Sequence, residues 1–284
     1  MPSFTNQATL SYRGNVTISN IVTGELVAVL SATKTALSER YSADDILTYV
    51  ISIVNSGPAP YTGLTMTDDL GAYTYGTGTL TPLTYVDGSL RYFVNGVLQA
   101  TPTPTADAPL TVPGIAVPAG GNALLIYETR VNSFAPLDTE STVTNTATLS
   151  GAGLTTPVQA ASTVNARAAA YLTIGKAVSP ATVAENGTLT YTFTIQNYGN
   201  TAAAETDNVT VSDTFSPILK AISVTYNGVA WTEGTQYAYN AATGAFATTA
   251  GQITVPAASL TRDTATGAVV VTPGISTLTV TGTV

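Results

Sequence analysis

The sequence has no cysteine and no histidine among its 284 residues. Without cysteine the chain forms neither disulfides nor thiolate metal sites. Without histidine it lacks imidazole metal ligands, the serine–histidine–aspartate triad and the commonest general base. Its glycines show no phosphate-loop pattern either. We therefore expect no enzyme, no cofactor and no metal site.

Charge is also scarce, at 9% of residues, and the net charge is −8 with only nine basic residues. Those nine stand singly, whereas nucleic-acid binding needs a basic face, so we expect no nucleic-acid partner. No apolar run approaches the roughly 18 residues of a membrane span. The first residues, Met1–Asn6, show neither the basic region nor the apolar core of an ordinary signal peptide. We expect neither a membrane span nor a signal peptide.

Hydrophobic residues make up 44% of the sequence, and Val, Ile, Thr and Tyr alternate with other residues at period two along most of it. Helical periodicity is almost absent. Short runs of this kind, separated by Gly, Pro and Asn, predict an all-β fold of Ig-like β-sandwiches. We interpret the Pro-rich stretch Thr101–Pro113 as an exposed loop, because proline is excluded from central strands.

The pattern occurs twice, because segments of the first half recur in the same order after Arg167. Lys34 is followed by Tyr49–Gly57 and Lys176 by Tyr191–Gly199, and both runs end in Asn-x-Gly. Such repetition predicts two tandem copies of one domain. Further matched pairs are Leu64–Asp68 with Val209–Asp213, Tyr92–Gly96 with Val224–Gly228, and Leu125–Val131 with Thr279–Val284.

Three parts follow: an N-terminal extension (residues 1–25), a first sandwich (26–166) and a second sandwich (167–284). The first sandwich ends with the run Val143–Ser150, Val-Thr-Asn-Thr-Ala-Thr-Leu-Ser, which has no counterpart at the end of the second. The extension nearly repeats it as Phe4–Ser11, Phe-Thr-Asn-Gln-Ala-Thr-Leu-Ser. We expect the second sandwich to lack its final strand or strands and to be completed by the N-terminal segment of a neighbouring subunit.

These motifs, in the order Lys, Tyr-x5-Asn-x-Gly, Val-x-x-Asp, Pro-x-Gly and Thr-Asn-x-Ala-Thr-Leu-Ser, resemble the extracellular repeat family called domain of unknown function 11. The resemblance covers most of Leu26–Val284. It implies β-sandwiches of bacterial and archaeal surface proteins, with a structural or adhesive role in place of a catalytic one. The motifs also resemble pilin and adhesin domains that form Lys–Asn isopeptide bonds. The sequence departs from the family in the missing last strand of the second domain.

Each repeat places one lysine, one aspartate and one asparagine on the apolar face of its strands. Residues of equal parity in a strand share a face, so Lys34 lies with Leu30 and Ala32. Asp69, next to Asp68, points the other way, and we predict that it is solvated. The two sets are Lys34, Asp68 and Asn145 in the first repeat, and Lys176, Asp213 and, from a neighbouring subunit, Asn6 in the second.

Burying such groups unpaired is costly, so we expect the members of each set to meet. Desolvation would lower the pKa of the lysine and raise that of the aspartic acid. The protonated Asp68 and Asp213 would then polarise the asparagine carbonyl and shuttle protons while the lysine amine attacks and ammonia leaves. The alternative is a buried Lys–Asp ion pair with the asparagine as a hydrogen-bond partner and no covalent bond.

We predict the structural subunit of an extracellular filament on a cell or spore surface, a homopolymer built head to tail and reinforced by isopeptide bonds. Identical head-to-tail donation does not close, so it yields a fibre. Two alternatives stay open: residues 4–24 fold back on their own chain, or the sequence is a piece of a longer repeat array. A monomeric adhesin that binds surface glycans is the second functional hypothesis.

Overall fold

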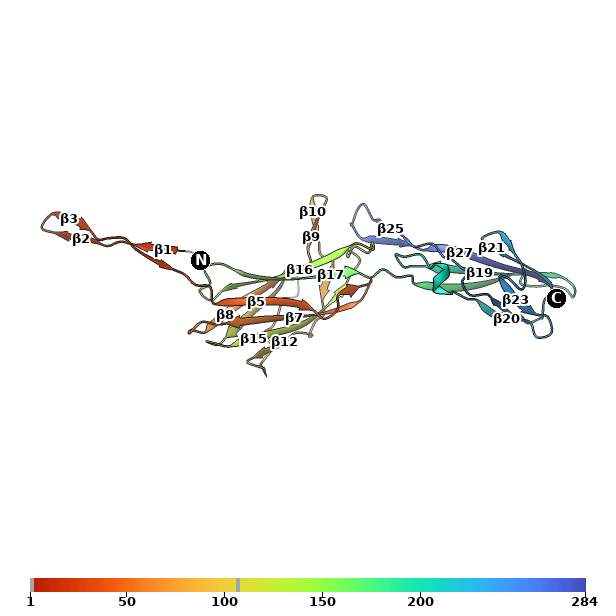
Figure 1. Cartoon of the computed structure of the whole chain (residues 1–284), viewed down its shortest axis with the longest axis horizontal. Coiled ribbons are helices and arrows are strands. Elements are labelled where there is room, and N and C mark those ends of the chain that lie inside the picture. Colours follow the sequence, from red (N-terminus) through yellow and green to blue (C-terminus); the bar gives the residue numbers. More distant parts are fainter. Residues whose placement is uncertain (1–2, 106–107) are drawn as a thin grey trace. The chain divides into compact units, whose positions relative to one another are not determined.

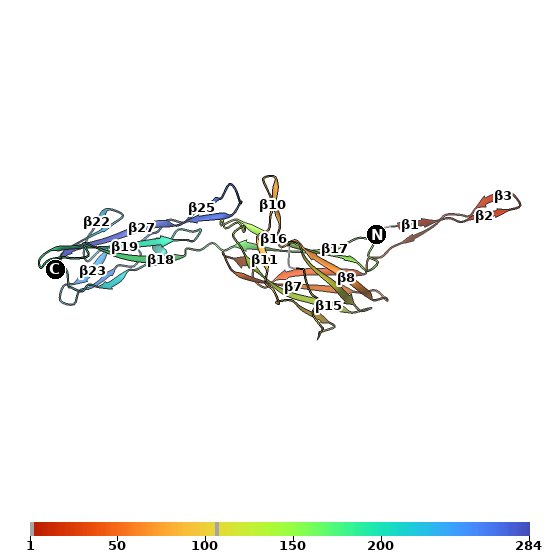
Figure 2. The same ribbon diagram turned by 180° about the vertical axis from the view of Figure 1, so that it is seen from behind.

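The computed structural model describes residues 3–105 and 108–284. Strands form nearly all of its regular structure, and the helical part of these residues is one 3-10 turn, Glu205–Asp207. The prediction of an all-β fold is confirmed. Figures 1 and 2 show the strands from opposite sides, coloured along the sequence. In the described part of the chain, no helix has the length and apolar character needed to cross a membrane.

The first sandwich contains a six-stranded antiparallel sheet in the order β13-β12-β15-β7-β5, with β11 also paired to β15. Buried and less buried positions alternate along β7, so that Tyr49 and Ile51 face the core. The strands are β5 (Leu30–Ala36), β7 (Ile46–Asn55), β11 (Leu83–Tyr85), β12 (Arg91–Val94), β13 (Val97–Leu98) and β15 (Asn122–Val131).

The facing sheet has five strands in the order β14-β8-β16-β17-β6. β16 lies against β8 with Ala147 opposite Asp68, and β6 pairs with β17 in parallel. Alternate residues of β16 are buried, which places Asn145 on the core face. The strands are β6 (Arg40–Tyr41), β8 (Tyr61–Asp68), β14 (Leu110–Val117), β16 (Thr142–Gly151) and β17 (Val158–Ala166), beside a separate hairpin of β9 (Tyr73–Tyr75) and β10 (Gly78–Leu80).

The predicted loop Thr101–Pro113 is wrong in its last part, because β14 begins at Leu110 and buries Leu110 and Val112. Pro113 lies inside β14, where the register with β8 shifts after Val112. β14 is also the edge strand of its sheet. Edges and bulges are the places where a strand tolerates proline. Residues 106–107 of this stretch lie outside the described residues.

The second sandwich has a counterpart of the six-stranded sheet of the first sandwich, but of only part of its five-stranded sheet. Its larger sheet has five strands in the order β18-β19-β27-β21-β22, and the facing sheet has three, β20-β24-β23. Among the described residues, β20 is hydrogen-bonded to β24 alone, on one side. The strands are β18 (Leu172–Ser179), β19 (Thr188–Asn197), β20 (Ser212–Thr214), β21 (Lys220–Tyr226), β22 (Val229–Trp231), β23 (Tyr237–Asn240), β24 (Ala245–Thr248) and β27 (Gly274–Thr283), beside a hairpin of β25 (Ser259–Arg262) and β26 (Val269–Thr272).

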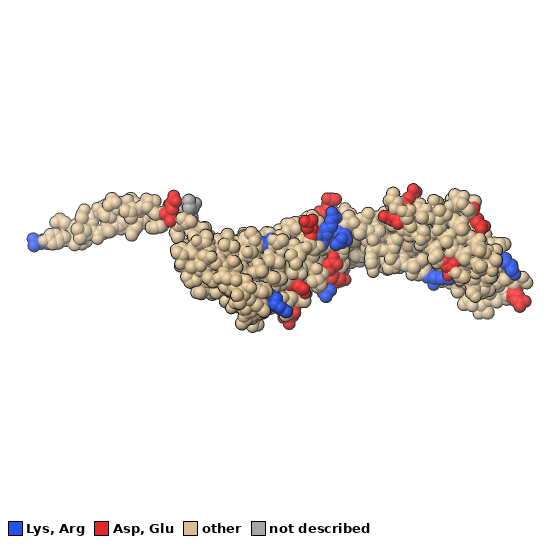
Figure 3. Space-filling view, turned by 60° about the horizontal axis from the view of Figure 1, so that its bottom comes forward, with Lys and Arg blue, Asp and Glu red and all other residues tan. Residues whose placement is uncertain are grey.

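The N-terminal residues form a two-stranded arm, red in Figure 1. β1 (Ser3–Asn6) pairs with β4 (Val22–Glu25), and β2 (Thr9–Tyr12) pairs with β3 (Asn15–Ile18). Nearly every residue of these strands is exposed, so the arm has no core of its own. Uncharged residues cover most of the face that Figure 3 draws, the arm included. We call residues 3–25 the arm below.

By their contacts the residues divide into two units. One contains Arg40–Ala43, Asn132–Val143 and Asn165–Val284, and the other contains the remaining described residues. The three parts expected from the sequence, residues 1–25, 26–166 and 167–284, stay a prediction.

Candidate functional site

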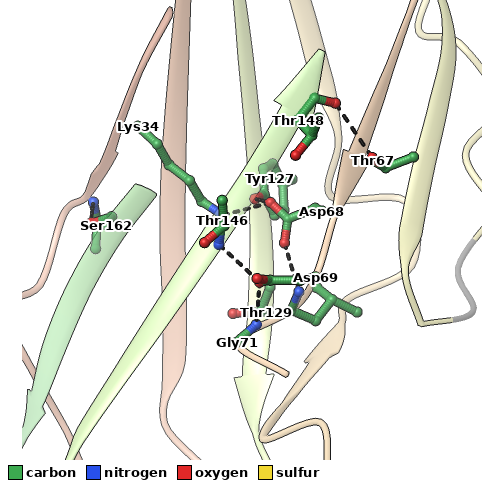
Figure 4. Close-up of polar contacts among 12 residues, drawn as sticks. Lys34, Thr67, Asp68, Asp69, Gly71, Tyr127, Thr129, Thr146, Thr148 and Ser162 are labelled. Carbon is green, nitrogen blue, oxygen red and sulfur yellow. Dashed lines mark hydrogen bonds and ion pairs between the residues drawn. The ribbon is translucent and has the colours of Figure 1, made fainter. Parts of the chain in front are cut away.

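The core of the first sandwich contains an ion pair between Lys34 and Asp68. Lys34 extends from β5, and Asp68 comes from β8 in the facing sheet. Lys34 Nζ lies 2.5 Å from Asp68 Oδ2, and both side chains are fully buried. Figure 4 shows the lysine reaching towards the carboxylate beside Tyr127. The predicted meeting of a lysine and an aspartate in this core is therefore present.

Asp68 receives three hydrogen bonds, which satisfy its buried carboxylate. Besides Lys34, the Tyr127 hydroxyl donates to Oδ2, and the backbone N–H of Leu70 donates to Oδ1 at 3.0 Å. Sequence reasoning missed Tyr127. Its position in the alternating run of β15 indicated burial, but not that its hydroxyl would meet Asp68.

The environment of Lys34 is aromatic as well as acidic. Its Nζ lies 4.8 Å from the centroid of the Tyr49 ring and 5.9 Å from that of Tyr127, and the two rings stack on each other. Burial lowers the pKa of Lys34 below 10.5, although the neighbouring Asp68 charge opposes that change. Burial, followed by the charge of Asp68, raises the pKa of the Tyr127 hydroxyl well above 10.0. Burial therefore disfavours the charged form of both the Lys34 amine and the Tyr127 phenol.

Asn145 is the third member of the set and is fully buried on β16, the strand next to β8. Neither its Nδ2 nor its Oδ1 has a hydrogen-bond partner among the described residues. Its amide acts on Tyr127 closely enough to lower the pKa of that hydroxyl slightly, but the geometry falls short of a hydrogen bond. An unsatisfied buried polar group costs about 1–3 kcal/mol, so the Asn145 amide in this position destabilises the fold.

Asp69 is only partly solvated, although we predicted that it is solvated. It is half-buried and accepts hydrogen bonds from the backbone N–H groups of Gly71 and Thr146, both at 2.8 Å. Asp69 lies where β8 ends and the chain turns, so strand parity no longer fixes its surroundings. Its contact with Thr146 ties the end of β8 to β16, the strand that carries Asn145 (Figure 4).

The second set is only partly assembled. Lys176 on β18 forms an ion pair with Asp213 on β20, and its Nζ lies 4.7 Å from the Tyr191 ring centroid. The Lys176 side chain is nevertheless 42% exposed, whereas that of Lys34 is fully buried. Burial of both lysines, expected from parity, therefore holds only for Lys34 within the described chain. Along β18 every residue after Leu172 is exposed, whereas Leu30 and Lys34 of β5 are buried.

Asn6, the expected third member of the second set, lies on β1 of the arm. It pairs with Val22 of β4 and is exposed. Residues 3–105 and 108–284 contain no group of three or more acidic residues arranged to hold a metal ion.

No family model and no curated protein matches the chain. Among solved structures, it is similar to the pilus backbone RrgB from Streptococcus pneumoniae, at 10% identity over 87% of this chain and 55% of that one, with a TM-score of 0.36. It is similar to the major pilin SpaD from Corynebacterium diphtheriae, at 12% identity over 87% and 49%, with a TM-score of 0.35. A third similarity, to the collagen-binding domain of a Staphylococcus aureus adhesin, has 12% identity over 49% and 99% and a TM-score of 0.30. The chain spans about half the length of the two pilins it matches.

Proposed function

We propose that this chain is the structural subunit of an extracellular surface filament, in which the arm of one molecule completes the second sandwich of the next. One observation carries the proposal. β8 of the first sandwich is hydrogen-bonded to β16, whereas β20 has no such neighbour among the described residues, and a near-copy of β16 lies exposed as Phe4–Ser11. An unpaired strand edge beside exposed apolar residues favours addition of a strand.

Within the first sandwich, the proposal includes an isopeptide bond between Lys34 and Asn145. A proton passes from the Lys34 ammonium to Asp68, which leaves a neutral amine beside a carboxylic acid. The amine nitrogen attacks Cγ of Asn145, the new C–N bond forms and the Cγ–Nδ2 bond breaks. One proton of the amine moves through Asp68 to the leaving nitrogen, and ammonia departs. The lowered pKa of Lys34, its 2.5 Å contact with Asp68 and the unpartnered amide of Asn145 support this step.

Between subunits, the same reaction joins Asn6 of one molecule to Lys176 of the next, with Asp213 in the role of Asp68. The Lys176–Asp213 pair already exists in the single chain, and the exposure of Lys176 leaves room for the arriving strand. Each bond forms once, so the chain is a reactant and not an enzyme. Because the subunits are identical and the donation is head to tail, the product is a fibre.

The proposal also places the filament outside the cell, on a cell or spore surface. The alternative of a monomeric adhesin that binds surface glycans stays a prediction, because the chain offers no specific observation in its favour. Electron microscopy across a range of protein concentrations separates the two. Fibres support the filament, whereas a monomer with glycan affinity at every concentration contradicts it.

Boiling in SDS tests the covalent part. We expect a ladder of linked chains from wild-type fibres, and fibres of Lys176→Met that dissociate to single chains. The matched control, Lys34→Met, removes the bond within the first sandwich and should keep the ladder. A Lys176→Met ladder equal to that of the wild type would refute the inter-subunit bond. Polymerisation of a chain without residues 1–25 would refute donation by the arm.

A further inference from the structure

The arm resembles more than one strand of the first sandwich. We infer that the donated element is a two-stranded hairpin, so that the arm replaces both β16 and β17 in the second sandwich of another copy of this chain. The inference rests on the proposed function and specifies its interface. It concerns the second strand of the arm, residues 15–25, for which the short sequence match to β16 gives no role.

The turn of the arm repeats the turn that follows β16. After the first strand, Arg13 and Gly14 have left-handed φ angles of 47° and 81°, and after β16, Ala152 and Gly153 have φ angles of 49° and 80°. Two consecutive residues of positive φ form a tight turn, which joins β2 directly to β3, whereas four residues separate Gly153 from the start of β17 at Val158. The chain therefore reverses at the same point after the Thr-Asn-x-Ala-Thr-Leu-Ser run in both places.

The second strand of the arm continues into β5 as β17 continues into β18. Residues 24–55 align with residues 166–197 without a gap, each standing 142 positions before its counterpart, as with Lys34 and Lys176. At this spacing the buried Val164 of β17 corresponds to Val22, and the buried Ala160 corresponds to Ile18. Both arm residues are apolar and more than half exposed. Val22 and Ile18 are therefore apolar residues at positions whose counterparts in β17 are buried.

The connecting segments are held in the same way. The backbone N–H of Ser56 donates to the carbonyl of Val29 at 2.9 Å, and that of Tyr198 donates to the carbonyl of Tyr171 at 2.8 Å. The buried Asn55 and Asn197 each accept a hydrogen bond from the glycine two residues later. The same hydrogen bonds therefore hold the segment between the arm and the first sandwich and the segment between β17 and the second sandwich.

The second sandwich has a cavity at the position that corresponds to the end of the β16–β17 hairpin in the first sandwich. In the first repeat, Tyr41 pairs with Ala166 of β17, and its carbonyl accepts from the backbone N–H of Arg167 at 2.7 Å. The counterpart of Tyr41 is Val183, 142 positions later. Val183 lines a cavity of about 440 Å³ together with Asn186, Pro217, Lys220 and Val284. The end of the donated hairpin, around Gly24, fills this place.

The occupant is a second copy because its sequence supplies both strands and the register. In the first sandwich Thr148 pairs with Thr67, and Asn165 pairs with Arg40. Transferred through the repeats, these pairs place Thr9 opposite Ser212 and Thr23 opposite Thr182. The first pair reports on docking of the first strand, and the second pair reports on docking of the second.

Cysteine cross-linking tests the two contacts separately, since the natural sequence has no cysteine. One chain carries Thr9→Cys and is mixed with a chain carrying Ser212→Cys, and a second mixture combines Thr23→Cys with Thr182→Cys. After assembly and oxidation with copper–phenanthroline, we expect disulfide-linked pairs of unlike chains in both mixtures. Pairing partners lie within the Cα separation that a disulfide spans. The control mixture, Thr17→Cys with Thr182→Cys, should give none, because position 17 lies six positions before position 23 along an extended chain.

The outcomes distinguish this inference from the proposed function. Fibres that cross-link only through the Thr9–Ser212 pair would mean single-strand donation, which overturns the hairpin and keeps the filament. Fibres that cross-link through neither pair overturn donation by the arm, and a chain that forms no fibres overturns the proposed function. A chain carrying both Thr23→Cys and Thr182→Cys that links only to itself shows closure within one molecule, which also overturns the inference.

Discussion

Replacing Asn145 by leucine decides whether the buried set in the first sandwich is covalently joined. The two side chains are similar in size, but leucine can neither react nor leave polar atoms unsatisfied. Without a bond, Asn145→Leu removes an amide whose Nδ2 and Oδ1 have no partner among the described residues, which stabilises the sandwich by about 1–3 kcal/mol. In Asn145→Leu, Lys34 and Asp68 keep their ion pair, which the wild type has only if no bond forms.

With a bond, the same substitution has the opposite sign. The bond closes a loop from Lys34 to Asn145, which are 111 positions apart, and loop-closure entropy for that length gives about 5 kcal/mol. At about 4 °C per kcal/mol for a domain of this size, the melting temperature falls by about 20 °C. Without a bond, it rises by about 4–12 °C.

Calorimetry of the full chain measures this change, and the single tryptophan provides an internal control. Trp231 lies in the second sandwich, so its fluorescence follows that sandwich alone and should not respond to Asn145→Leu. As a matched substitution, Asn55→Leu should destabilise in either case, because Asn55 donates to the carbonyls of Ala59 and Pro118. A wild-type mass without loss of one ammonia, together with a higher melting temperature for Asn145→Leu, refutes the bond.

Three further predictions concern Lys34, Tyr127 and Gly199. In Asn145→Leu, Lys34 cannot be acylated and has a pKa below 10.5 in the folded chain. Between that lowered pKa and 10.5 the unfolded chain binds more protons than the folded chain, so stability to denaturant should rise with pH. Tyr127 opposes this rise only above pH 10.0, and a flat profile up to that pH contradicts the expectation. Tyr127→Phe removes a hydrogen bond to a carboxylate and should lower the free energy of unfolding, measured with denaturant, by about 1.5–3 kcal/mol. The control Tyr85→Phe, whose hydroxyl accepts one 3.3 Å hydrogen bond, should lower it by about 0.5–1 kcal/mol. Equal losses would contradict the role of Tyr127. Gly199→Ala should lower the melting temperature more than Gly57→Ala. A Cβ at Gly199 would lie 2.1 Å from the backbone oxygen of Ala169, whereas at Gly57 its nearest neighbour is a side-chain methyl of Val29 at 2.7 Å, and overpacking costs about 1–3 kcal/mol. The reverse order contradicts this account.

Strand alternation was sufficient to predict the interior of the first sandwich. Lys34, Asp68 and Asn145 each share parity with apolar neighbours, and all three are buried. The same rule could not say which buried groups touch, because contact between facing sheets depends on how the sheets stack. Tyr127 was missed for this reason: its burial follows from alternation, but its hydrogen bond to Asp68 requires the three-dimensional arrangement.

The ends of strands were predicted least well. The near-repeat of β16 at Phe4–Ser11 is divided between two separate ladders, β1 with β4 and β2 with β3, which the repetition did not predict. Asp69 and Pro113 failed similarly, because a turn and a bulge, respectively, interrupt the period of two on which the predictions depend. Tandem repetition, in contrast, carried information over long distances, and it led correctly to the ion pair of Lys176 with Asp213.

The place of the hairpin in the chain has a consequence for connectivity. Ten residues, Asn132–Ser141, link β15 to β16 in the first sandwich, and β27 is the counterpart of β15 in the second. A circularly permuted chain, in which such a linker and then residues 3–25 follow Val284, contains the same strands in a different order. Each of its sandwiches is followed by a hairpin that can close it, so we expect a closed monomer with no fibre. Polymer and monomer would then differ in topology alone, with the same side chains making the same contacts.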